Sequence, residues 1–197
     1  RYGVLPILKS VTSEGKPYYR AVVVAKENSP IKRLSDLKGR SMAFAAVMST
    51  SGNLIPRYML AWAGIHLKDL SDYRNFNYHD TVVKWVLKGK FDAGAVREAV
   101  ADKYLPLGLK IIDKSEPIPT GPVVVGPKTP YSLVERIKGA LLNIKNSPSG
   151  RKALKKTDPE LQGGFIPASD SDYQRTRKLI NDVPKTCGMG CHPKIKL

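Results

Sequence analysis

Much of what would mark a particular function is missing from this sequence. No Ser-His-Asp set, pair of carboxylates or closed metal cluster stands out, so we do not expect an enzyme. The longest apolar stretch, residues 42–48, is far too short to cross a bilayer, so no transmembrane segment is expected. No internal repeat or low-complexity segment is present. What remains is an ordinary globular composition, with 42% hydrophobic and 25% charged residues.

Acidic residues are also scarce. The chain has 33 Lys and Arg against 17 Asp and Glu, a formal net charge of +16. This excess favours an anionic ligand, an acidic protein partner or an acidic membrane surface. The basic residues are spread singly or in pairs, and no arginine-rich arm, helix-turn-helix or aromatic-interleaved stripe concentrates them. Nucleic acid is therefore not an expected partner.

Short apolar segments alternate with helical patterns between residues 17 and 126. Strands are predicted at 17–29, 41–47, 92–96, 109–115 and 118–126. Helices are predicted to begin near Ser49 and at Asp80, and the chain turns mainly helical beyond Pro130. Strand–helix–strand alternation on this scale predicts an α/β fold built on a parallel sheet.

The first stretch with distinctive chemistry is Met-Ser-Thr-Ser-Gly-Asn, residues 48–53, between a predicted strand and a predicted helix. Ligands bind at the carboxyl edge of open α/β sheets, and a helix N-terminus presents N–H groups to an anion. The hydroxyl groups of Ser49, Thr50 and Ser51 add neutral donors, so these residues are candidates for holding an oxyanion. The plainer alternative is a helix N-cap with two spare hydroxyl groups.

His79 occupies the same kind of position, just before the next predicted helix. A lone histidine there is usually a surface or capping residue. Two strand-to-helix junctions that both carry polar donors are more suggestive than either alone. His79 is therefore a candidate for reaching the same crevice as the three hydroxyl residues.

Four segments together resemble the PhnD-like family of phosphonate-, phosphite- and phosphate-binding proteins, the periplasmic solute-binding components of ABC importers. These segments are residues 29–65, 79–96, 118–125 and 164–180, in the order that the family has them. The resemblance implies an α/β fold of the type II periplasmic-binding-protein class, with two lobes that close over a ligand. It also implies a periplasmic location, an importer permease as partner, and contacts from Ser49, Thr50, Ser51 and His79 to the ligand oxygens.

The chain departs from the family pattern in two ways. Family members begin with further strands and helices of the first lobe, whereas this chain starts at Arg1, with neither an initiator methionine nor a signal peptide. We therefore expect a processed or partial chain that lacks the first part of lobe 1. Glu98 is only an approximate match to the acids that hold the amine of aminoalkylphosphonates, and the second acid is missing. An amine-bearing ligand is therefore not expected, and two alternatives stay open: a simple oxyanion, or no ligand at all.

The resemblance also implies a division of the chain. The expected parts are the end of lobe 1 with a crossover (1–28), lobe 2 (29–120), a mainly helical return to lobe 1 (121–182) and a C-terminal tail (183–197).

Both cysteines lie in the tail, in the run Thr-Cys-Gly-Met-Gly-Cys-His at residues 186–192. The spacing C-x-x-x-C-H is a less common variant of the haem c attachment motif, in which Cys187 and Cys191 form thioether bonds and His192 binds the iron. A disulfide is one alternative, and a Cu(I) site is another. Candidates for the sixth iron ligand are Met42, Met48, Met59, Met189, His66 or a residue of another chain.

Two classes of function remain open. The sequence is interpreted as a periplasmic PhnD-like oxyanion-binding scaffold with a covalently attached haem c, acting in electron transfer or redox sensing. The positive charge would then steer docking to an acidic redox partner. The alternatives are a plain importer binding protein whose two cysteines form a disulfide, and a copper-binding periplasmic protein.

Overall fold

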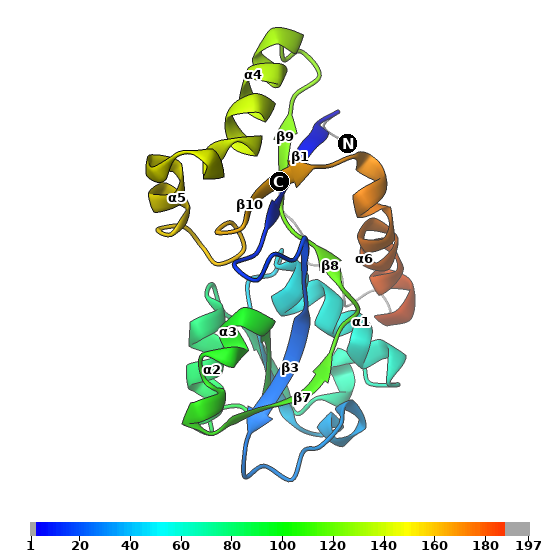
Figure 1. The fold of residues 1–197 in the computed structure, drawn as a ribbon. Helices are drawn as coiled ribbons and strands as arrows, with labels where there is room; N and C mark the ends of the chain where they lie inside the picture. The colour runs from blue at the N-terminus through cyan, green and yellow to red at the C-terminus, as the bar shows by residue number, and fades with distance from the viewer. Residues whose placement is uncertain (1–2, 188–197) are drawn as a thin grey trace. The chain divides into compact units, whose positions relative to one another are not determined.

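The chain folds into two compact units in the computed structural model, which describes residues 3–187 and side chains as far as residue 181. Among the described residues, unit 1 contains 3–19 and Pro117–Thr176, and unit 2 contains Arg20–Glu116 and 177–187 (Figure 1). The chain passes from unit 1 to unit 2 after Tyr19, within the residues 1–28 expected to hold the crossover. The strand Ala21–Lys26 already pairs with strands of unit 2, although the expected lobe 2 began at residue 29.

Unit 2 is built on a five-stranded sheet with the order β5-β4-β6-β3-β7. The strands are β3 (Ala21–Lys26), β4 (Ser41–Phe44), β5 (Asp72–Asn75), β6 (Ala93–Arg97) and β7 (Leu109–Lys114). β4 and β6 run parallel, as the alternation predicted, and β5, which is not among the predicted strands, is parallel to β4. β3 is antiparallel to both of its neighbours. β3 follows directly from unit 1 without a crossover helix, so the sheet is mixed rather than wholly parallel.

Apolar residues at helical spacing place the helices of unit 2 on this sheet. The helices are α1 (Ile55–Trp62), α2 (His79–Leu87) and the short α3 (Glu98–Asp102). Val82, Val83 and Val86 of α2 are fully buried against the strands. Gly94 of β6 allows this close approach, because a Cβ there would lie 2.7 Å from Val82 Cγ1 and 2.9 Å from Val86 Cγ2.

Unit 1 contains an antiparallel three-stranded sheet, in the order β10-β1-β9. Its strands are β1 (Leu5–Val11), β9 (Pro122–Val125) and β10 (Gly164–Pro167), and a separate short ladder joins β2 (Tyr18–Tyr19) to β8 (Ile118–Pro119). The helices that follow are α4 (Tyr131–Leu142), α5 (Pro148–Leu154) and α6 (Gln174–Cys187). α6 begins in unit 1 and continues into the part of the chain assigned to unit 2.

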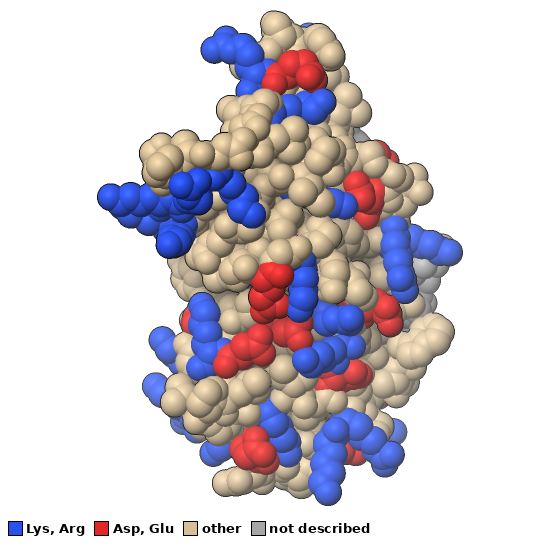
Figure 2. All heavy atoms as spheres, in the orientation of Figure 1, with Lys and Arg blue, Asp and Glu red and all other residues tan. Residues whose placement is uncertain are grey.

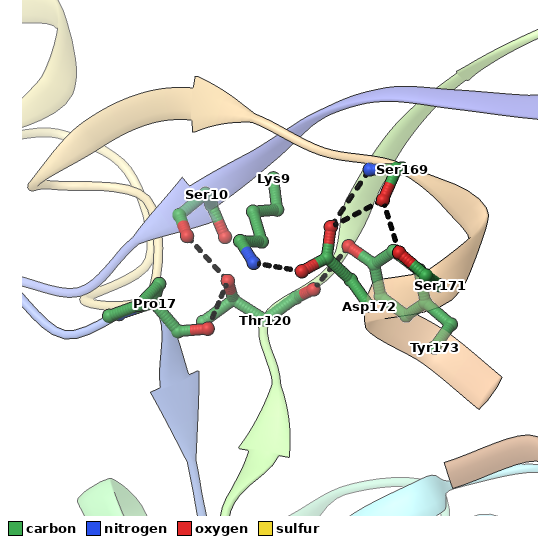
Figure 3. Close-up of polar contacts among 8 residues, drawn as sticks. All are labelled: Lys9, Ser10, Pro17, Thr120, Ser169, Ser171, Asp172 and Tyr173. Carbon is green, nitrogen blue, oxygen red and sulfur yellow. Dashed lines mark hydrogen bonds and ion pairs between the residues drawn. The ribbon is translucent and has the colours of Figure 1, made fainter. Parts of the chain in front are cut away.

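A polar cluster inside unit 1 ties β1 to the segments that follow β8 and β10 (Figure 3). The buried Thr120 hydroxyl donates to the carbonyl oxygens of Ser10 and Pro17, and the Tyr173 hydroxyl donates to the Thr120 carbonyl at 3.0 Å. Burial raises the pKa of Tyr173 to about 12. These contacts join residues far apart in the sequence, so they fix the chain path around the β2–β8 ladder.

Lys9 and Asp172 form an ion pair in the same cluster, and it makes the stability of unit 1 depend on pH. Their Nζ–Oδ1 distance is 2.6 Å, and the hydrogen bond from Lys9 holds the pKa of Asp172 below its ordinary value. The stabilisation is present above the pKa of an unfolded aspartate, about 3.9, and is lost as the pH falls through the folded value. We expect Asp172→Asn to lower stability by about 0.5–1 kcal/mol at neutral pH and by much less in acid.

Denaturant unfolding at a series of pH values measures this difference. The matched control is Glu14→Gln, which breaks the exposed Lys16–Glu14 pair and is expected to change stability less. A loss in Asp172→Asn that is the same at acidic and neutral pH would show that the ion pair is not its source.

Basic side chains are distributed widely over the surface, as the sequence indicated. On the face shown in Figure 2, Lys and Arg are scattered and interleaved with Asp and Glu. Within the described residues, we find no helix with both the length and the apolar character needed to cross a membrane.

Candidate anion-binding site

The stretch predicted to bind an anion folds as a helix start. After β4, Thr50–Leu54 forms a π-helical turn that continues into α1. Ser49 is the N-cap, because its Oγ accepts a hydrogen bond from the Gly52 N–H at 3.1 Å. The first N–H groups of a helix have no acceptor within the helix, so they are the backbone donors that an anion can use.

The sheet topology brings His79 to the same place. β4 and β5 are adjacent and parallel, with Phe44 opposite Asn75, so the chain leaves both strands at the same edge. His79 is the first residue of α2, and its Nε2 lies 3.5 Å from Ser49 Oγ. The two strand-to-helix junctions identified in the sequence therefore meet in the structure.

The backbone of β6 determines which nitrogen of His79 carries the proton. The Arg97 N–H donates to His79 Nδ1 at 3.2 Å. A ring nitrogen that accepts a hydrogen bond carries no proton, so the neutral imidazole has its proton on Nε2. Nε2 lies 3.5 Å from Ser49 Oγ, at the limit of a hydrogen bond, so the Nε2–H faces the N-cap of the turn.

The hydroxyl group of Ser49 is likewise oriented as a donor. Its oxygen already accepts from the Gly52 N–H, so the hydroxyl proton can be directed at a ligand. Ser49 and His79 are both half-buried, and both present neutral donors. Such a set suits reversible binding of an oxyanion, because neutral donors stabilise negative charge without forming a fixed ion pair.

The other two predicted hydroxyl contacts differ in exposure. Thr50 is half-buried, whereas Ser51 is only 3% exposed and lies inside the turn. Contact of either residue with a ligand stays a prediction. Three large apolar side chains beside Ser49 and His79 in the sequence are exposed: Val47 (38%), Met48 (63%) and Tyr78 (71%).

Two carboxylates are close to His79 along the chain or next to a residue that contacts it. Asp80 follows His79 directly, and Glu98 follows Arg97, whose N–H donates to the imidazole. Both already have partners. Glu98 accepts from Lys114 Nζ at 2.6 Å. Asp80 accepts from the Tyr104 hydroxyl at 2.8 Å, and this hydrogen bond raises the pKa of Tyr104. Neither carboxylate is therefore placed to serve an ammonium group without giving up an existing contact.

Sequence reasoning missed a buried polar cluster attached to the turn, formed by Asn53, Arg57 and Asn75. Arg57 donates to the side-chain oxygens of both asparagines. The i, i+4 spacing of Asn53 and Arg57 on a helix could have suggested that they interact. No signal in the sequence identified Asn75 as their third partner.

The cysteine motif lies mostly outside the described residues. Cys187 is the last residue of α6, and Cys191, His192 and Met189 are not described. Between residues 3 and 187, no group of three or more His, Cys, Asp or Glu is arranged to hold a metal ion.

The remaining candidates for a sixth iron ligand fall in different environments. Met42 and Met59 are buried in the interior of unit 2, with 0% and 9% exposure, which makes them core residues. Met48 is 63% exposed and His66 is half-buried.

Comparison with known proteins finds phosphonate- and phosphite-binding proteins. The family described as phosphonate ABC transporter, periplasmic substrate-binding protein, matches residues 1–173. The chain is 35% identical, over 44% of its length and 32% of the relative's, to a probable ABC transporter phosphite-binding protein, PhnD1, of Prochlorococcus marinus. It is 27% identical, over 75% of its length and 47% of the relative's, to the phosphonates-binding periplasmic protein of Escherichia coli. The chain thus spans a third to a half of these relatives.

Solved structures show the same fold. A binding-protein component of an ABC phosphonate transporter from Pseudomonas aeruginosa superposes with a TM-score of 0.79 at 20% identity, over 93% of this chain and 64% of that one. The structure of PhnD1 from Prochlorococcus marinus in complex with methylphosphonate gives 0.77 at 21% identity, over 93% and 72%. The mixed α/β binding-protein fold expected from the resemblance is therefore confirmed.

Proposed function

Because this chain belongs to the family of periplasmic substrate-binding proteins of phosphonate ABC transporters, we propose that unit 2 binds a phosphate- or phosphonate-type oxyanion through Ser49 and His79. The observation that carries the proposal is that Ser49 Oγ and His79 Nε2 lie 3.5 Å apart, where the chain leaves two adjacent parallel strands. The relatives are binding proteins rather than enzymes, in agreement with the absence of a catalytic set from the sequence.

We further propose that the ligand carries no amino group. Recognition of an ammonium group needs a carboxylate free to pair with it. Glu98 is held by Lys114, and Asp80 by Tyr104. The exposed apolar side chains of Val47, Met48 and Tyr78 instead favour either an unsubstituted oxyanion or one with a small alkyl group.

Isothermal titration calorimetry tests both statements. We expect phosphate, phosphite or methylphosphonate to bind, and 2-aminoethylphosphonate to bind at least about tenfold more weakly, since its ammonium group would lose water without gaining a partner. The matched variant is Glu98→Gln, which should leave the weak aminoethylphosphonate affinity unchanged. No heat with any of the four anions, together with an unchanged melting temperature, would contradict an oxyanion-binding function. Equal or tighter binding of the amine would contradict only the ligand class.

The family also suggests where and with what the protein acts. We propose a periplasmic location and delivery of the anion to an importer permease, since these are the attributes of the matching family. Fractionation of the native cells, followed by crosslinking of the full-length protein, tests this proposal. Recovery in the cytoplasm would contradict it.

The tail supports a second proposal, a c-type haem bound by Cys187, Cys191 and His192. It rests on the C-x-x-x-C-H spacing alone, in which the histidine directly after the second cysteine has no role in a disulfide. Such a haem would supply one-electron transfer, and the net charge of +16 would favour an acidic redox partner. A Soret band that survives acid–acetone extraction is expected after expression with cytochrome maturation. A colourless protein would leave a disulfide or a copper site.

A further inference from the structure

The buried cluster of Asn53, Arg57 and Asn75 is not needed for the donor set described above, yet it holds a full positive charge next to the anion turn. Asn53 is completely buried and Arg57 is 6% exposed. Arg57 Nε donates to Asn53 Oδ1 at 2.9 Å, and its Nη2 donates to Asn75 Oδ1 at 3.3 Å. A guanidinium group keeps its charge at any pH a protein meets. Since Asn53 belongs to the π-helical turn, the charge lies one side chain away from the turn.

The two asparagines also fix the connection that leads from β4 to Ser49. Asn53 Nδ2 donates to the carbonyl oxygen of Val47 at 2.6 Å, and Asn75 Nδ2 donates to that of Ala45 at 2.7 Å. Asn75 Nδ2 also lies 3.0 Å from Asn53 Oδ1. The negative ends of two peptide dipoles in this connection are therefore engaged by the cluster. Arg57 orients both amides, because it binds the oxygen atom of each.

Arg57 places a charge among apolar positions of α1. The neighbouring positions Ile55, Met59 and Leu60 of α1 are buried and apolar. Burying a charge carries a desolvation cost that a methionine or leucine would avoid. The cost is partly offset by two aromatic faces, since Arg57 Cζ lies 5.1 Å from the Phe44 ring centroid and 5.7 Å from that of Tyr73.

We propose that Arg57 positions the anion turn and makes the site selective for doubly charged over singly charged oxyanions. This proposal rests on the proposed function of the Ser49–His79 site. Arg57 acts in two separable ways: through hydrogen bonds to Asn53 and Asn75, and through a positive potential that burial protects from screening by salt. Coulomb energy is proportional to ligand charge, so the factor by which the potential favours a dianion is the square of the factor for a monoanion.

Phosphite and hypophosphite separate these two contributions at mildly alkaline pH, where phosphite is a dianion and hypophosphite a monoanion. Affinities are measured by NMR titration, so that weak binding is also quantified, for wild type, Arg57→Met, Arg57→Lys and Arg74→Met. We expect Arg57→Met to lower phosphite affinity about tenfold and hypophosphite affinity about threefold. Arg57→Lys keeps the charge, so it should keep the wild-type ratio of the two affinities. Arg74→Met removes an exposed charge from β5, the strand that also holds Asn75, and should change the affinity for neither anion.

The outcomes distinguish failure of the inference from failure of the proposed function. If wild type binds neither anion, the oxyanion site itself is wrong. If wild type binds and Arg57→Met loses both affinities equally, Arg57 does not select charge. If Arg57→Met keeps the wild-type affinity for both anions, Arg57 neither positions the turn nor selects charge. Circular dichroism checks folding. Should Arg57→Met fail to fold, Asn75→Asp places a carboxylate against the guanidinium, and the same preferential loss of phosphite binding is expected.

Discussion

Gly52→Ala is expected to weaken oxyanion binding about a hundredfold and to destabilise unit 2. A Cβ at this position would lie 2.2 Å from Ala45 Cβ, 2.7 Å from His79 Cε1 and 3.1 Å from Ser49 Oγ. Ala45 has no flexible side chain that could move aside, so the turn or the imidazole must shift. Overpacking of this kind costs about 1–3 kcal/mol of stability. Misaligning two donors to a charged ligand, each worth about 1.5 kcal/mol or more, lowers affinity about a hundredfold.

A second glycine provides a control in which the same substitution is expected to raise stability rather than lower it. Gly139 lies exposed within α4 of unit 1, and a Cβ there would meet no atom within 4 Å. Gly139→Ala is expected to raise stability by about 0.5–1 kcal/mol, because alanine is the better helix former, and to leave binding unchanged. Thermal unfolding and calorimetry measure both variants. Wild-type affinity in Gly52→Ala would show that the close packing of Gly52 against His79 and Ser49 is not required for the site.

The parts of the site that could be predicted from the sequence are those governed by local rules. Three successive hydroxyl residues between an apolar strand and an apolar helix predict a cap, and Ser49 is that cap. His79 could be placed because two parallel strands must end at the same edge of a sheet. Both predictions needed only periodicity and chain order, although whether these residues bind a ligand stays a prediction.

The burial of Arg57 could not be predicted from local sequence patterns. In the sequence Arg57 stands between Pro56 and Tyr58 near the start of a helix, where most arginines are solvated. Its burial depends on Tyr73 and Asn75, which belong to β5 and follow it by more than a dozen residues. Only the pairing of β5 with β4 brings these partners under the turn.

Two strands of unit 1, β1 and β10, were missed for a related reason, whereas β2, β8 and β9 lie within the predicted strands. β1 has the buried polar Ser10 and the half-buried Lys9 among its apolar residues, and β10 is only four residues long. Their pairing partners lie more than a hundred residues away along the chain, with Leu8 opposite Pro167. An alternating pattern weakened by polar residues becomes a strand here because β1 pairs with β9 and β10, and because its Lys9 has an ion-pair partner in Asp172.

Two conservative replacements of His79 are expected to separate its structural role from its role in binding. The amide oxygen of asparagine can take the place of Nδ1 and accept from the Arg97 N–H, but asparagine has no donor at the position of Nε2. The amide nitrogen of glutamine can take the place of Nε2 and donate to an anion, but glutamine leaves the Arg97 N–H without its acceptor. The wild-type imidazole carries both groups, an acceptor Nδ1 that lies 3.2 Å from the Arg97 nitrogen and a donor Nε2–H.

We therefore expect opposite patterns in the two variants. His79→Asn should keep near wild-type stability and lose about 10- to 100-fold in oxyanion affinity, the worth of one hydrogen bond to a charged acceptor. His79→Gln should keep more of the affinity but lose about 1–3 kcal/mol of stability, the cost of an unsatisfied backbone donor. Denaturant unfolding gives the stability of each variant, and calorimetry gives its oxyanion affinity. ¹⁵N NMR of the wild-type imidazole should show the Nε2–H form. Equal loss of affinity in both variants would mean that His79 only shapes the turn, because a residue that donates directly to the anion must distinguish glutamine from asparagine.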